Sequence, residues 1–150
     1  MVNRPSMLPG HRYRLRRSAD PNGAPPYVFL CIVRSKTLTF NTSYTEALLP
    51  DCDDADAIPV RSSTKSGSSW GATFSGTADP SRIDFLRTDI RQEEPTWYQF
   101  ELDPQDGVGA GVWQGRIHFE SLEIASADFG EVTFSVTARG DEDPTWIPAS

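Results

Sequence analysis

Two alternating patterns on either side of a short turn make up residues 112–140, VWQGRIHFESLEIASADFGEVTFSVTARG. In each pattern, apolar residues and Gly115 occupy every second position, with small or polar residues between them. Such a period of two is typical of a strand with one face on a core and the other toward solvent. A turn at 128–130 would join the strands, and residues 122–124 would prolong the first beyond a bend. The stretch therefore predicts a pair of strands at the centre of the fold.

Strand-like segments also precede this stretch. Residues 27–33 form a continuous apolar run, which predicts a buried strand with Cys31 as a small buried side chain. Residues 37–44, 70–78 and 96–102 alternate, and each predicts a half-buried strand.

One segment has the helical period instead. Ile83, Leu86 and Ile90 recur three and four residues apart, with charged residues between them. Asp79 and Pro80 precede them and suit the cap and the first turn of a helix. We therefore expect one helix over about residues 80–91. The predicted fold is mainly β, a β-sandwich or barrel with one flanking α-helix.

The longest segment without a predicted element is an inter-strand loop at about residues 48–69. It contains Pro50, Pro59, a run of aspartates and a polar string at 61–69. A loop of this length in a compact domain usually carries function, typically binding. Outside a domain at 27–140, composition marks residues 1–26 as a proline- and arginine-rich N-terminal arm and 141–150 as an acidic C-terminal tail.

The charge of the chain restricts its partners. A net charge of −7 and a pI near 4.7 argue against a surface that grips nucleic acid, which needs clustered lysine and arginine. The basic arm and the acidic loop have opposite signs, so they could meet between subunits. Neither a membrane span nor a secretory signal is visible, so we expect the product to stay in the cytoplasm.

Sequence patterns of catalysis and metal binding are absent. There is no nucleophile elbow, phosphate-binding loop or zinc-protease helix. Cys31 and Cys52 belong to no ligand pattern, and the aspartate run lacks the glycine and glutamate of a calcium loop. The sequence therefore predicts a protein that is not an enzyme and needs no cofactor or metal.

The order of these elements resembles a known family. FSGTAD, residues 74–79, places a strand directly before the predicted helix, and residues 112–140 resemble the ending of major tail tube proteins of tailed bacteriophages. The resemblance spans roughly residues 37–140 and points to the tubes of siphoviruses or of gene transfer agents. It implies hexameric rings that stack into a virion tail, are assembled in the host cytoplasm and conduct genomic DNA without binding it specifically. Partners would be other copies, the tape measure, the terminator, the baseplate or tip and, in a contractile tail, a sheath.

Three sets of residues are candidates for assembly. The inter-ring loop would use Glu46, Asp51, Cys52, Asp53, Asp54, Asp56, Arg61 and Lys65. The subunit-contact arm would use Arg12, Arg14, Arg16 and Arg17. The lumen-facing side chains would be Gln99, Glu101, Gln114 and Arg116.

Two other classes stay open on the sequence. One is a different virion component: a tail terminator, a connector or a capsid decoration protein. The other is a carbohydrate-binding β-sandwich that uses exposed tryptophans.

Overall fold

The computed structural model describes residues 7–104, 106–126 and 130–149. Within them it contains one 3-10 helix, one α-helix and seven strands. In chain order these are η1 (Gly10–Arg12), β1 (Tyr13–Ser18), β2 (Tyr27–Phe29), β3 (Val33–Leu49), β4 (Val60–Thr77), α1 (Asp84–Arg91), β5 (Thr96–Leu102), β6 (Gly111–Ser126) and β7 (Val132–Pro148).

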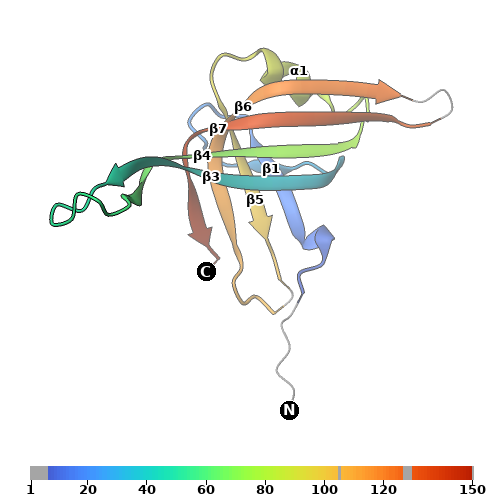
Figure 1. Ribbon diagram of the computed structural model, residues 1–150. Coiled ribbons are helices and arrows are strands. Elements are labelled where there is room, and N and C mark those ends of the chain that lie inside the picture. Colours follow the sequence, from blue (N-terminus) through green and yellow to red (C-terminus); the bar gives the residue numbers. More distant parts are fainter. Residues whose placement is uncertain (1–6, 105, 127–129, 150) are drawn as a thin grey trace.

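The strands form one antiparallel sheet in the order β2-β1-β5-β6-β7-β4-β3. The long strands β6 and β7 run through two halves of this sheet, which bends so that the halves face each other (Figure 1). The first half-sheet, as we call it, contains β2, β1, β5, residues 111–116 of β6 and residues 141–148 of β7. The second half-sheet contains β3, β4, residues 117–126 of β6 and 132–140 of β7. The expected mainly-β fold with one flanking helix is confirmed.

The bend between the halves is built around Trp70. Its indole packs on Gly115 and Gly140, and a Cβ at Gly115 would lie 2.6 Å from Cζ2 of the indole. Its Nε1 donates to the carbonyl oxygen of Glu142, which has a φ of 59°. The register of β6 against β7 also shifts between Gln114 and Arg116. A register shift of this kind places extra residues in one of the two strands, which bends that strand and increases its twist. β6 and β7 can therefore pass from one half-sheet to the other.

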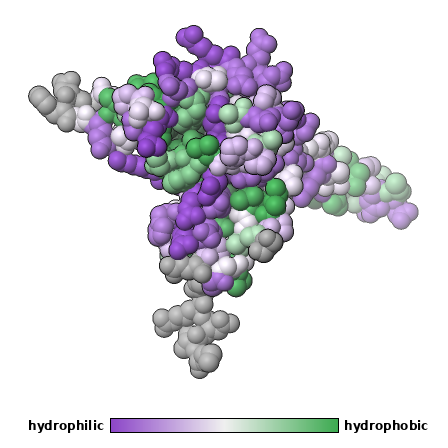
Figure 2. Space-filling model, turned by 180° about the vertical axis from the view of Figure 1, so that it is seen from behind, coloured by the Kyte–Doolittle hydropathy of each residue, from purple (hydrophilic) through white to green (hydrophobic). Residues whose placement is uncertain are grey.

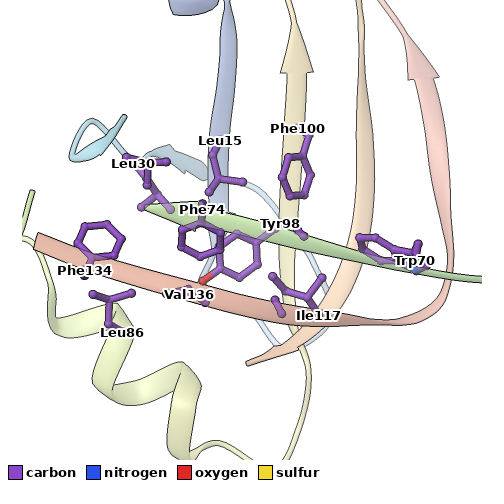
Figure 3. Close-up of a cluster of buried hydrophobic side chains, with 13 residues drawn as sticks. Leu15, Leu30, Trp70, Phe74, Leu86, Tyr98, Phe100, Ile117, Phe134 and Val136 are labelled. Carbon is purple, nitrogen blue, oxygen red and sulfur yellow. The ribbon is translucent and has the colours of Figure 1, made fainter. Parts of the chain in front are cut away.

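The core lies between the two half-sheets. Tyr98, Phe100 and Leu15 come from the first half-sheet, and Phe74 and Phe134 come from the second. Figure 3 shows these side chains pointing toward one another, with Leu86 of α1 near Phe134 and Val136. The helix therefore covers one side of the core.

The helix begins later than the sequence predicts. Asp79 and Pro80 form a turn. Oδ1 of Asp79 accepts one hydrogen bond from the backbone N–H of Ser81 at 3.0 Å and a second from the Ser81 hydroxyl at 2.8 Å. α1 itself begins at Asp84. Asp79 caps this turn instead of the helix, so the predicted start was wrong and the end at Arg91 was right.

The strand predicted at 27–33 is also different. β2 ends at Phe29, a turn follows, and β3 begins at Val33. β2 is an edge strand on which Val28 and Phe29 are exposed, and Cys31 is exposed in the turn. The prediction that Cys31 is buried was wrong, because an apolar run alone does not distinguish a central strand from an edge.

The terminal segments belong to the sheet. β1, in the predicted arm, pairs with β5 from Tyr13 to Arg17 and buries Leu15. Residues 141–148, predicted as a tail, continue β7 and pair with β6. The boundaries proposed at 26 and 140 therefore cut through one continuous sheet. The turn expected at 128–130 lies outside the described residues except for Gly130.

Candidate assembly surfaces

The β3–β4 hairpin projects beyond the rest of the molecule (Figure 1). β3 and β4 stay paired as far as Leu49 and Val60, so the loop spans 50–59 and is shorter than the predicted 48–69. The string at 61–69 is polar on both faces, which hid a strand that pairs along its length. Glu46 and Arg61 lie on the two strands and form an ion pair at 3.4 Å, and Lys65 is paired with Tyr44. The four aspartates and Cys52 lie in the exposed loop itself.

The far end of the hairpin is apolar as well as acidic. Leu48, Leu49, Ile58 and Val60 are all exposed there, Ile58 to 89% and Val60 to 69%. Seen from behind, the projection ends in a mixture of hydrophobic and hydrophilic residues (Figure 2). Residues 48–60, which we call the hairpin tip, thus expose apolar side chains that no other described residue covers.

The arginines of the predicted arm form ion pairs within the chain. Arg12 and Arg14 contact Asp103 at 3.2 and 3.0 Å. Glu101 accepts from Arg14 at 2.9 Å and from Arg16 at 3.0 Å. Arg17 points to the opposite face and pairs with Asp89 of α1. These contacts fix β1 on β5, and a role of the same arginines between subunits stays a prediction.

The predicted lumen residues lie on the same surface as these arginines. Gln99 and Gln114 face each other across β5 and β6, joined by a hydrogen bond of 2.8 Å. Arg116 pairs with Asp141 at 3.0 Å and Glu142 at 2.9 Å. The outer face of the first half-sheet therefore carries ion pairs and an amide pair across β1, β5, β6 and β7. The sequence assigned its members to two different roles, and the structure brings them together.

The outer face of the second half-sheet is rich in hydroxyl groups, and none of them was among the candidate residues predicted from the sequence. Registered pairs across β4 and β7 place Thr73 opposite Thr137, Ser75 opposite Ser135, and Thr77 opposite Thr133. The face continues onto β3 and β6 with Thr37, Thr39, Ser121 and Glu123. At its end beside the bend, Arg139 contacts Glu120 at 3.5 Å. We call it the hydroxyl face; the polar half of each alternating pattern was the signal that could have revealed it.

Two long edges of the second half-sheet have no strand partner among the described residues. β3 pairs only with β4, and residues 118–126 of β6 pair only with β7. Such edges present unpaired backbone N–H and C=O groups and readily take up a further strand.

A groove of about 280 Å³ lies between α1 and the turn that joins β2 to β3. Val28, Phe29, Ile32 and Phe85 supply its apolar walls, and Cys31 also lines it. We call it the α1 groove; Arg17, Arg82 and Asp84 are its charged lining residues.

No group of three or more histidine, cysteine or acidic side chains in the described part of the chain is placed to hold a metal ion. No helix in that part of the chain is long and apolar enough to cross a membrane.

Three solved structures with a similar fold come from a tail, a tail tube and a sheath–tube complex. A chain from the tail of an empty gene transfer agent (GTA) particle, determined with C6 symmetry, matches with a TM-score of 0.72 at 14% identity, over 93% of this chain and 98% of that one. The SPP1 tail tube gives 0.62 at 10% identity, over 95% and 80%. A sheath–tube complex of an extracellular contractile injection system, PVC, gives 0.61 at 13% identity, over 95% and 93%. No protein-family model and no curated protein matches the chain. The chain has the fold of these tail and tube chains, as the resemblance in its sequence implied.

Proposed function

We propose that this protein is the structural subunit of a virion tail tube, in which six copies form a ring and rings stack into a channel for DNA. The observation that carries the proposal is the pair of free edges on one half-sheet of a tail-tube fold. The neighbour with C6 symmetry supports the number of copies.

Ring closure follows from the two free edges. In the second half-sheet, β3 lies at one side and residues 118–126 of β6 lie at the other. If β3 of one copy pairs with β6 of the next, every copy contributes four strands to one closed barrel. Closure removes the unpaired edges, which would otherwise promote aggregation.

A barrel closed through these edges has one face of the second half-sheet inside and the other outside. The face that packs on the core of its own subunit would lie outside, so the hydroxyl face would line the channel. We proposed Gln99, Glu101, Gln114 and Arg116 from the sequence, and these lie on the first half-sheet. We now propose the side chains around Thr73 and Thr137 instead. Hydroxyl groups are hydrated and uncharged, and Arg139 already contacts Glu120. A duplex would therefore meet no free cluster of cations that could hold its phosphates.

Such a subunit works by geometry and not by catalysis. Its partners would be copies of itself and the tail proteins at the two ends of the tube, and its place would be the virion tail. No cofactor enters this role.

Assembly of the purified full-length chain tests the proposal. We expect sedimentation to show particles much larger than a 16.6 kDa monomer, and negative-stain microscopy to show rings or hollow tubes. A hexamer that never stacks would indicate a terminator instead. A stable monomer at high concentration would contradict the proposal.

A further inference from the structure

We propose that the hairpin tip of one copy binds in the α1 groove of a second copy. This inference rests on the proposed function only in requiring that copies assemble; it specifies which two surfaces meet. Its basis is that the hairpin tip exposes apolar side chains at one end of β3, while the α1 groove, which has apolar walls, lies at the other end of that strand.

The tip has apolar side chains that need a cover. The projection that the other described residues do not reach carries four exposed apolar side chains, Leu48, Leu49, Ile58 and Val60 (Figure 1). A cluster of exposed apolar residues rimmed by polar ones commonly marks a protein interface. The acidic side chains of the loop provide the polar rim.

The groove offers a matching surface. Val28 and Phe29 are large hydrophobic residues that stay exposed at its wall, and Phe85 of α1 lies across from them. Arg82 reaches Asp79 at only 3.5 Å, and its side chain is largely exposed, so it is available to an incoming carboxylate. Asp84, the acidic lining residue, is already paired with Arg87. The hairpin tip, which combines acidic and apolar side chains, therefore complements the α1 groove in both charge and polarity.

The two surfaces cannot meet within one chain. β3 begins at Val33, directly after the turn that lines the groove, and ends at Leu49, close to the loop. Its 17 extended residues hold the groove and the tip on the order of 50 Å apart. A contact between opposite ends of the molecule is head-to-tail, the kind that continues from copy to copy. The occupant of the groove is therefore a second copy of this chain.

Each of these two surfaces contains one of the two cysteines of the chain. Cys31 lines the groove and Cys52 lies in the tip; both are free and exposed. The sequence contains no others. Their proximity between copies can thus be measured without adding a label.

The test uses full-length assemblies, imaged by electron microscopy and treated with a short bis-maleimide after removal of reductant. We expect a denaturing gel to show a ladder of dimers and higher multimers, because each copy supplies one thiol to each of two neighbours. Cys31→Ser and Cys52→Ser should each abolish the ladder while tubes still form. Tubes co-assembled from a mixture of the two variants should give dimers and nothing larger.

Three results would overturn the inference. Tubes without any crosslink in the wild-type chain would mean that the tip docks elsewhere, while the proposed function stands. A dimer that survives in either single variant would mean that like cysteines meet. If the chain forms no assembly at all, the inference fails together with the proposed function.

Discussion

Arg17 on β1 and Asp89 on α1 form a two-point ion pair, with Nε–Oδ2 at 2.8 Å and Nη2–Oδ1 at 2.6 Å. The carboxylate is only 1% exposed and also accepts hydrogen bonds from the hydroxyls of Thr96 and Tyr98. A residue of the predicted N-terminal arm thus holds the helix against the sheet. The arm is a structural part of the domain.

Asp89→Asn tests this anchor. Loss of the charge leaves the guanidinium of Arg17, only 16% exposed, without its counter-ion. Removing one partner of a buried ion pair costs about 3–5 kcal/mol, so we expect a large drop in the free energy of unfolding measured with urea. Asp84→Asn is the matched control, because its pair with Arg87 on the same helix is solvent-exposed and should contribute little. Equal effects of the two substitutions would argue against a special role for Asp89.

Gly140→Ala tests the bend between the half-sheets. A Cβ at this position would overlap the indole of Trp70, which is itself buried. Overpacking of this kind costs about 1–3 kcal/mol, and we expect a lower melting temperature by calorimetry. Gly67→Ala serves as the control: it lies on the exposed hairpin with no atom within 4 Å of the added Cβ. A Gly140→Ala protein as stable as wild type would show that the bend does not depend on this contact.

Alkaline pH should destabilise the fold mainly through two tyrosines. Burial raises the pKa of Tyr98 well above its ordinary value and that of Tyr13 to about 12. In the unfolded chain both hydroxyls lose their protons near pH 10, whereas in the folded protein they keep them. Their contribution to stability is therefore complete below pH 10 and is lost as the pH rises above it.

The measurement is a series of urea unfolding curves between pH 8 and about 11.5. We expect the midpoint to fall above pH 10 in the wild type and to fall less in Tyr13→Phe, which removes one of the two groups. A midpoint that stays constant over this range would contradict the assignment.

Thr73→Lys tests which face lines the channel. Thr73 lies opposite Thr137 on the hydroxyl face, so the change would place a ring of positive charges inside each ring of subunits. We expect tubes assembled with short duplex DNA to retain it at low salt in a nuclease-protected form, and to release it at high salt. Thr145→Lys adds the same charge on the first half-sheet, opposite Gln114, and should protect no DNA. Protection by Thr145→Lys instead would place the other half-sheet in the channel.

The sequence predicted best where one face of a strand is buried. Residues 96–102 form β5 as expected, because Tyr98 and Phe100 alternate with polar side chains and point into the core. The same alternation identified the central parts of β4, β6 and β7. It also supported the resemblance to tail tube proteins, whose fold the structure has.

It failed where neither face of a strand is buried by the chain itself. The outer part of β4, around Lys65, is polar on both sides, so no period of two marks it as a strand. Pro144 and the acidic residues of 141–148 hid the end of β7 for a similar reason. The ion pairs of Arg14 with Glu101 and Asp103 depend on the pairing of β1 with β5, which the sequence does not specify. The neighbours of these segments are distant parts of the chain or, as we propose, other copies.

The most direct test of the tube assignment is a cryo-electron microscopy reconstruction of assemblies formed by the full-length protein. We predict sixfold rings in a hollow tube, with β3 of one copy beside residues 118–126 of β6 in the next and Thr73 and Thr137 facing the channel. A protein that remains monomeric, or a ring in which Gln99 and Gln114 face the channel, would contradict this account.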